Sequence, residues 1–469
     1  MLHDYVEKQL LAHFSFVPTD NQKSAFRELA KFITSETEVF IMNGYAGTGK
    51  TTLVRALIET LQSLETPYAL LAPTGRSAKV LSNYTKGTAL TIHKKIYRQR
   101  SVTDGVQKFG MNFNAAQHTI YIVDEASMLS DTTGENALFG SGSVLNDLFR
   151  FVFNEHSCKL ILIGDTAQLP PIGVVESPAL DADYIERNFL KKTATVTLTQ
   201  IIRQAEDSGI LTDATNIRNH IENEDITIPK LKTFDDVEQI DGSMLLDALE
   251  SSHNKVGIQD TIVITRTNKL ANRYNAGIRN RILWKDSTVS KGDYIMIVKN
   301  NYFWTEGNKE ISFIANGDIA EIVSIDKYEN MYGFDFADVT LKFPDYQDLE
   351  LSVKVMLNTL SSESASLTFD ENNKLYSEVC ADYADIKNKR KLYEEVKKNP
   401  YYNALQIKFA YAITCHKAQG GQWKHVYIDH GYFTDEMLNK EFLCWLYTAF
   451  TRASEKIYLV NFKDEFFDS

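Results

Sequence analysis

The sequence predicts an α/β protein built around a doubly wound sheet of parallel strands. Three apolar segments, residues 39–42, 119–123 and 159–165, have the length and composition of buried strands. Segments with helical periodicity separate them, and this alternation is typical of a doubly wound core. The first strand runs into a glycine-rich turn that opens a helix over residues 52–62. These observations place the chain in the doubly wound α/β class.

Length and composition fit a soluble globular protein of several domains. The chain has 469 residues, of which 43% are hydrophobic and 24% are charged, and a chain of this length is expected to form roughly two to four domains. No segment approaches the ~18 apolar residues of a membrane span, and the N-terminus carries acids where a signal peptide is basic. We expect no association with a membrane.

Cysteine spacing indicates the cellular compartment of the protein, and net charge limits how it can bind nucleic acid. The four cysteines, Cys158, Cys380, Cys415 and Cys444, lack the spacing of a zinc site or of a disulfide framework, so we expect a protein of the reducing cytoplasm. The net charge of −12 argues against a protein that coats nucleic acid. A local groove for nucleic acid stays compatible with this charge, because backbone contacts need only a few well-placed donors.

The turn after the first strand has the full P-loop pattern, Gly44-x-x-x-x-Gly49-Lys50-Thr51. Its glycines let backbone N–H groups turn toward an anion at a helix N-terminus. Lys50 is expected to reach the β- and γ-phosphates, and the Thr51 hydroxyl is expected to bind Mg²⁺. We predict that this loop binds a nucleoside triphosphate. The predicted binding residues here are Gly44, Gly47, Thr48, Gly49, Lys50, Thr51 and Thr52.

An acidic pair follows the second predicted strand. Asp124 ends this strand, where its carboxylate is expected to hold Mg²⁺ through water, and Glu125 is placed to orient or deprotonate an attacking water. The pair predicts that the site hydrolyses its nucleotide. Gln168 follows the third strand and is a candidate sensor of the γ-phosphate, although a loop amide that caps a helix is the alternative.

The motifs resemble, in order and over nearly the whole chain, those of superfamily 1 helicases in the 5′→3′ branch that holds RecD and the phage Dda helicase. The segments that carry the resemblance are Phe16-x-x-Thr19-x-x-Gln22, "APTGRSAKVL" (72–81), "TIHKKIY" (91–97), "LTQIIRQ" (198–204), "ITRTNKLANRYN" (264–275), "AYAITCHKAQGGQW" (410–423) and "LYTAFTRASEKIYLV" (446–460). The resemblance implies that ATP and Mg²⁺ are the cofactors.

The resemblance also implies roles at the nucleotide. The Gln22 amide is expected to pair with the adenine edge, and Gln419 with Gly420 is expected to lie at the nucleotide. Arg203 and Arg452 are the candidate guanidiniums that stabilise charge on the transferring phosphoryl group. Both arginines are far from the P-loop in the sequence, so each acts only if a second domain closes over the nucleotide.

By the same resemblance, strand contacts are expected in both motor domains. A translocating protein holds its strand independently of sequence, through the backbone and by base stacking. His93 and His416 have an alternative role as packed histidines. The expected contacts are Pro73, Thr74, His93, Thr267, Asn268, Thr414, His416 and Lys417.

The resemblance predicts two RecA-like motor domains with one insertion in each. The first domain is expected over residues 1–195, and a pin hairpin is expected over residues 97–118, with its turn at Asp104-Gly105. The second is expected over residues 196–285 and 401–469, interrupted by an SH3-like β-barrel over residues 286–400. Phe109, Met111 and Phe113 are candidates to stack on the last base pair of a duplex; packing of the hairpin on its domain is an equal alternative.

The expected function is that of an ATP-dependent DNA helicase that translocates 5′→3′ on single-stranded DNA. Its expected partners are single-stranded DNA and junctions with duplex, with replication or repair proteins as further candidates, and we expect a monomer. Four alternatives stay open: a strand-stimulated ATPase that unwinds little, an RNA substrate, a subunit that grips strands without turnover, and a P-loop kinase that acts on a small molecule.

Overall fold

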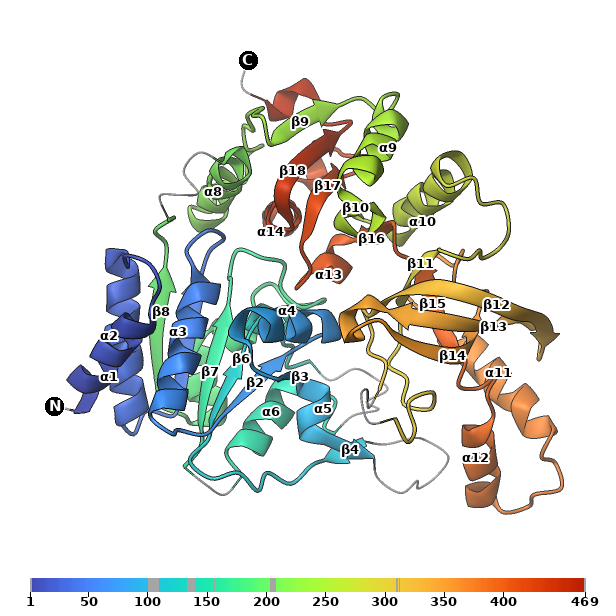
Figure 1. Cartoon of the computed structure of the whole chain (residues 1–469), viewed down its shortest axis with the longest axis horizontal. Helices are drawn as coiled ribbons and strands as arrows, with labels where there is room; N and C mark the ends of the chain where they lie inside the picture. The colour runs from blue at the N-terminus through green and yellow to red at the C-terminus, as the bar shows by residue number, and fades with distance from the viewer. Residues whose placement is uncertain are drawn as a thin grey trace.

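The computed structural model describes residues 2–99, 109–132, 140–154, 157–202, 208–308, 311 and 313–467 (Figure 1). The predicted turn at Asp104-Gly105 and the candidate arginine Arg203 lie outside these residues, and so does the side chain of Phe109. Among the described helices, none is both long and apolar enough to cross a membrane.

The first α/β domain is built on a six-stranded sheet in the order β3-β2-β6-β7-β1-β8, with all of its neighbours parallel. The strands are β1 (Val39–Gly44), β2 (Tyr68–Ala72), β3 (Ala89–Thr91), β6 (Ile120–Val123), β7 (Lys159–Gly164) and β8 (Thr193–Leu198). The helices are α1 (Leu2–His13), α2 (Asp20–Thr34), α3 (Lys50–Ser63), α4 (Gly75–Thr85), α5 (Ile92–Ile96), α6 (Val144–Val152) and α7 (Ala182–Phe189). The three predicted strands β1, β6 and β7 lie side by side in its interior.

This sheet is buried on both faces, which explains why its strands are apolar without alternation. In β1, Phe40 and Met42 pack in the core formed with α1, α2 and α3, whereas Val39 and Ile41 pack in the core formed with α5 and α6. Successive side chains of a strand point to opposite faces, so each face needs its own apolar residues. The sheet continues to Leu198, three residues beyond the expected domain limit at 195.

The structure describes the base of the predicted hairpin, where two short strands pair. The strands β4 (Tyr97–Gln99) and β5 (Phe109–Met111) pair antiparallel, with Tyr97 opposite Met111. They project from the first domain beyond α5.

The second α/β domain contains a five-stranded parallel sheet in the order β16-β10-β17-β18-β9. Its strands are β9 (Val237–Ile240), β10 (Thr261–Thr265), β16 (Ala412–Thr414), β17 (Trp423–Asp429) and β18 (Ala453–Val460). Its helices are α8 (Gly209–Glu222), α9 (Leu245–Val256), α10 (Asn268–Gly277), a π-helix (Ile278–Ile282), α13 (Cys415–Ala418) and α14 (Lys440–Phe450). The sheet therefore unites two parts of the chain on either side of a long insertion.

The insertion forms a closed barrel in the order β11-β12-β13-β14-β15. Its strands are β11 (Tyr294–Ile297), β12 (Ile319–Met331), β13 (Phe334–Phe343), β14 (Leu349–Met356) and β15 (Leu405–Phe409), and the helices α11 (Phe369–Ala381) and α12 (Lys389–Lys398) lie between the last two. β15 lies beyond the expected limit at 400. The predicted fold class, with two α/β domains, a hairpin insertion and a barrel insertion, is confirmed.

Candidate functional site

The P-loop is a tight turn between β1 and α3. Gly47 and Gly49 have φ angles of 74° and 82°, a left-handed conformation that strains other residues and that glycine adopts freely. The Thr48 hydroxyl donates to the Tyr45 carbonyl at 2.7 Å and closes the turn from inside. The two left-handed glycines thus make the tight turn that leads into the start of α3, where the helix dipole favours an anion.

Lys50, the first residue of α3, lies inside this loop. Its Nζ donates to the carbonyls of Gly44 and Tyr45, the latter at 3.1 Å, and lies 3.9 Å from Asp165 Oδ2. The ammonium group is therefore held at the loop, beside the carboxyl ends of β1 and β7. This is the position from which a lysine reaches the β- and γ-phosphates of a nucleotide.

The two predicted acids at the end of β6 have different surroundings. Asp124 accepts the Glu125 N–H at 2.9 Å on Oδ1 and the Tyr84 hydroxyl at 2.6 Å on Oδ2. Burial raises the pKa of Glu125, and the positive charges of Arg452 and Lys50 oppose this rise. Glu125 also has a left-handed φ of 53°, a strained conformation for a side chain of this size. A half-buried carboxylate that feels the charge of two cations suits a general base.

The oxygen donors at this point fit a Mg²⁺ ion. The Asp124 carboxylate and the Thr51 hydroxyl both lie beside the Tyr84 phenol. Asp124 accepts the hydroxyl of that phenol, and a hydrogen bond with Thr51 lowers its pKa. Hard oxygen ligands of this kind, completed by phosphate oxygens and water, are those that Mg²⁺ prefers. Within the described ranges there is no group of three or more His, Cys, Asp or Glu side chains that would cage a metal.

Gln168 and Asp165 complete the first-domain side of the site. Asp165 directly follows β7 and is 1% exposed. Burial raises the pKa of its carboxyl. The Gln168 side chain is 6% exposed, and its Oε1 finds no hydrogen-bond donor among the residues that the structure describes. A buried amide oxygen without a donor costs free energy unless a further group or water supplies one, which fits the predicted sensor of the γ-phosphate.

The second domain reaches directly into this site through α14 and the loop after α13. The Tyr447 hydroxyl accepts the Ala46 N–H of the P-loop at 2.9 Å and donates to Asp165 Oδ2 at 2.8 Å. Gln419 Nε2 donates to the Leu169 carbonyl at 2.7 Å. The P-loop thus lies at the interface with the second domain, and this interface is called the crevice below.

Arg452 belongs to the second-domain wall of this crevice. Its guanidinium donates to the carbonyls of Thr448 at 3.1 Å and Gly421 at 3.3 Å and to the Thr451 hydroxyl at 3.0 Å. Its positive charge lowers the pKa of Glu125 against the larger effect of burial. The structure therefore brings Arg452 to the crevice that holds Lys50, Asp124, Glu125 and Gln168.

Two further residues expected at the nucleotide, Gln22 and Gly420, make contacts that the structure describes. Gln22 caps α2 by accepting the Thr19 N–H at 2.9 Å, and it donates to the Thr48 carbonyl at 3.0 Å. Its amide thus supports the P-loop from behind, where a Cβ on Gly49 would lie 2.7 Å from Gln22 Nε2. Gly420 lies close to Ser77 and to the N-cap Thr74 of α4, and its role at the nucleotide stays a prediction.

The expected strand contacts gather at helix N-termini. Thr74 caps α4, Thr267 caps α10, and Thr414 precedes α13. Pro73 and Asn268 flank the first two caps. A helix N-terminus presents free N–H groups that favour the phosphates of a backbone.

Burial lowers the pKa of three other expected strand contacts. It lowers the pKa of His93 to about 4 and lowers the pKa of His416 as well. It also lowers the pKa of Lys417 to about 8, and the Lys417 Nζ has no hydrogen-bond acceptor in the described part of the chain. A buried ammonium group without an acceptor is costly, so Lys417 is suited to receive a phosphate.

The hairpin residues do not share one environment. Met111 packs against the core of the first domain, beside α5 and α6, whereas the Phe113 side chain is 54% exposed. The packing of Met111 favours its structural role, and the exposure of Phe113 leaves it available for stacking.

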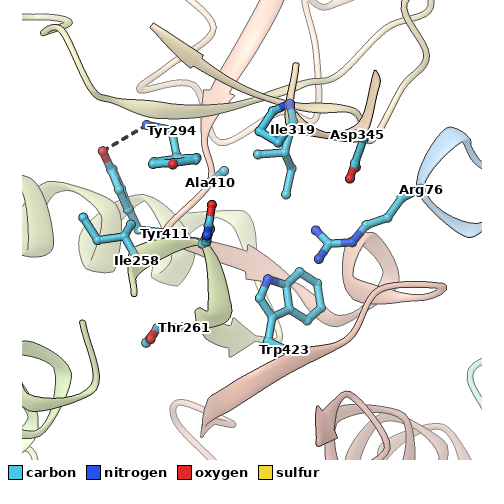
Figure 2. A pocket seen from close by; sticks show the side chains of 11 residues that line it. Arg76, Ile258, Thr261, Tyr294, Ile319, Asp345, Ala410, Tyr411 and Trp423 are labelled. Carbon is cyan, nitrogen blue, oxygen red and sulfur yellow. Dashed lines mark hydrogen bonds between the residues drawn. The ribbon is translucent and has the colours of Figure 1, made fainter. Parts of the chain in front are cut away.

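The N-terminal turn of α4 lies where both α/β domains and the barrel meet, around a small pocket of about 80 Å³ that is partly open to solvent (Figure 2). The Arg76 guanidinium lies 4.1 Å from the centre of the Trp423 ring, and Arg76 donates to the Gln422 carbonyl at 3.3 Å. Lys79, one turn further along α4, donates to the Pro344 carbonyl at 2.7 Å and to Asp345 at 3.1 Å. α4 therefore contacts both the second α/β domain and the barrel insertion.

Three residues of the site were not predicted from the sequence. Asp165 ends β7 as Asp124 ends β6, and the carboxyl ends of parallel neighbours meet at one edge, so this signal was present. Tyr447 lies within a recognised motif, but no sequence signal predicts its contact with the P-loop. Tyr84 lies within an ordinary helical pattern, and no sequence signal indicates its bond to Asp124.

Comparison with protein families finds two models that match different parts of the chain. A model described as an AAA domain matches residues 18–241, and one described as a UvrD-like helicase C-terminal domain matches residues 409–460. The chain is 30% identical over 198 residues to the ATP-dependent RecD2 DNA helicase of Deinococcus radiodurans, with 42% of this chain and 24% of the relative covered. It is 28% identical over 330 residues to the ATP-dependent DNA helicase dda of phage T4, with 65% of this chain and 67% of the relative covered.

Solved structures agree on the fold. A Bacteroides Pif1 helicase, crystallised with ADP-AlF3 and ssDNA, matches with a TM-score of 0.50 at 15% identity, covering 97% of this chain and 95% of that one. Fold and site thus define a P-loop protein with two RecA-like domains around one nucleotide crevice. The resemblance seen in the motifs is confirmed: the chain is similar to superfamily 1 helicases of the SF1B, RecD/Dda-like type.

Proposed function

We propose that the protein is an ATP-dependent DNA helicase that translocates 5′→3′ on single-stranded DNA and unwinds duplex. The observation that carries this proposal is the crevice itself, because the Tyr447 hydroxyl of one domain bonds both the P-loop and Asp165 of the other. A nucleotide bound there touches both domains, and its hydrolysis alters their contact. This is how a chemical step becomes a movement.

The chemistry assigns a role to each group in the crevice. Lys50 and the P-loop amides would bind the phosphates, and Thr51 and Asp124 would hold Mg²⁺, which neutralises developing charge when bound. Glu125 would take a proton from the attacking water. Arg452, from the other wall, would stabilise charge on the transferring phosphoryl group.

Movement requires that the two domains grip the strand separately. Thr74 and Pro73 belong to the first domain, whereas Thr267, Asn268, Thr414 and Lys417 belong to the second. The distance between the two groups of contacts depends on whether the crevice is closed. Alternate gripping during opening and closing would then advance the strand.

The test uses forked duplexes that carry only a 5′ tail or only a 3′ tail, with ATP hydrolysis recorded alongside. The proposal expects unwinding of the 5′-tailed fork and hydrolysis stimulated by single-stranded DNA. Unwinding of the 3′-tailed fork alone would reverse the polarity. Hydrolysis that DNA does not stimulate would favour a small-molecule kinase, and stimulation by RNA alone would change the substrate.

A second candidate is a strand-stimulated translocase that separates duplex poorly. The packing of Met111 into the core of the first domain favours it, because this side chain is then withdrawn from the place of a wedge. Phe113→Ala separates the two functions: unwinding falls while translocation continues if the exposed ring stacks on the duplex, and neither changes if the hairpin only packs.

A further inference from the structure

Helix α4 joins two parts of the molecule that the proposed function uses separately. It begins at the N-cap Thr74, an expected strand contact, whose Oγ1 accepts the Ser77 N–H at 3.1 Å. It reaches Tyr84 near its other end, and the Tyr84 hydroxyl donates to Asp124 Oδ2 at 2.6 Å. One short helix therefore connects the expected strand path to the carboxylate expected to hold Mg²⁺.

The hydrogen bond between Tyr84 and Asp124 is short, as bonds from a hydroxyl to a charged oxygen are. The phenol is the donor in this bond, because an ionised carboxylate can only accept. The other carboxylate oxygen of Asp124 accepts the Glu125 N–H at 2.9 Å. Both oxygens are thus fixed, and each keeps a second lone pair for a metal-bound water.

We propose that Tyr84 is a positioning residue whose hydroxyl holds the Asp124 carboxylate for Mg²⁺ and couples it to the helix that meets the strand. Partners of a metal-binding carboxylate fix its orientation, and losing one weakens metal binding about 10- to 100-fold. The part of the proposal that concerns the strand rests on the proposed function. The part that concerns the metal depends only on the nucleotide site.

The helix is suited to transmit a displacement. It has 11 residues, which at ~1.5 Å per residue span about 16 Å. Its first turns are held by the second domain at Gln422 and by the barrel at Pro344, so a change at either contact moves the helix as a unit. A shift of the Tyr84 hydroxyl by a few tenths of an ångström changes a bond of 2.6 Å.

The test replaces Tyr84 by phenylalanine, which removes the hydroxyl and keeps the ring that packs against the core of the first domain. The full-length protein binds a fluorescent, non-hydrolysable ATP analogue while Mg²⁺ is titrated. Tyr84→Phe is expected to raise the Mg²⁺ concentration for half-maximal enhancement of binding about tenfold, with nucleotide affinity in the absence of Mg²⁺ unchanged. An unchanged Mg²⁺ titration overturns the proposal.

Tyr68→Phe is the matched control. Its hydroxyl accepts a hydrogen bond from Gln62 Nε2 at 2.7 Å, at the start of β2 and away from the nucleotide crevice. The same atom is therefore removed from the same domain without touching Asp124. A tenfold effect in Tyr68→Phe as well would assign the result to stability and overturn the role of Tyr84.

A second measurement tests the coupling through α4. The affinity for a single-stranded oligonucleotide is measured with and without the Mg²⁺-bound analogue, and their ratio is the coupling factor, typically about 5- to 150-fold. Tyr84→Phe is expected to bring this factor close to one. An unchanged factor would overturn the link through the helix. If the unmodified protein binds no oligonucleotide, the proposed function fails, while the Mg²⁺ titration still decides the role of Tyr84.

Discussion

The pH dependence of strand binding provides a sharp test of the second-domain contacts. Burial lowers the pKa of Lys417 from 10.5 to about 8, so the protonated fraction of its ammonium falls as the pH rises through 8. If Lys417 binds a strand phosphate, the phosphate restores the pKa toward its ordinary value. Strand binding then takes up a proton above pH 8, and affinity falls as the pH increases.

The expected size follows from these two pKa values. In the free protein the ammonium is ~90% protonated at pH 7 and ~10% at pH 9, whereas in the complex it stays protonated at both. Affinity for a single-stranded oligonucleotide should therefore fall about tenfold between pH 7 and pH 9, which corresponds to about 1.4 kcal/mol. The assay is fluorescence anisotropy of a labelled oligonucleotide at constant ionic strength, since salt alone changes such affinities.

Lys417→Arg is the matched control, because a guanidinium stays charged throughout this range. Its affinity should hardly change between pH 7 and pH 9. Any change that remains belongs to other groups, among them Lys408, whose pKa is lowered to about 8 by burial and by the charge at position 417. Lys417→Met should bind more weakly at both pH values. Equal pH dependence in the unmodified protein and in Lys417→Arg would refute the assignment of Lys417 to the strand.

Three further predictions concern catalysis, the crevice and stability. Glu125→Gln should lower ATP hydrolysis by about 10²- to 10⁴-fold while binding of an ATP analogue is retained, because only the proton acceptor is lost; retained hydrolysis would exclude Glu125 as the base. Tyr447→Phe leaves the buried Asp165 without its 2.8 Å donor and should cost about 1–3 kcal/mol in stability, measured by denaturant unfolding. Asp293→Ala leaves Arg279, whose Nη2 lies 3.1 Å from that carboxylate, buried and unpaired, and should cost about 3–5 kcal/mol; a cost under 1 kcal/mol would mean that water enters the site.

The parts of the fold that the sequence predicts are those governed by local rules. β1, β6 and β7 are buried on both faces, so their apolar runs are uninterrupted and easily recognised. β8 was not recognised as a strand of the first sheet, because the expected domain limit at 195 divides it; the alternation of its threonines with apolar residues is a strand signal that was present. The P-loop glycines are equally local, since a left-handed turn requires them.

The parts of the site that the sequence did not predict depend on contacts between distant segments. Tyr447 meets Ala46 across 401 residues, and Tyr84 meets Asp124 across 40. Neither separation leaves a periodic pattern or a turn signal. Gly420 is expected at the nucleotide from its motif, and its close approach to Ser77 of the other domain is a contact that only the assembled domains determine.

The most direct test of a nucleotide site completed by both domains is DNA-stimulated ATP hydrolysis by Arg452→Ala. Arg452 lies on the second-domain wall and is 4% exposed, so the variant is first checked for unchanged binding of an ATP analogue. A guanidinium that stabilises phosphoryl transfer contributes about 10³- to 10⁵-fold, and the stimulated rate should fall at least a thousandfold. A rate within tenfold of the unmodified protein would contradict the account, because the first domain alone would then carry out the chemistry.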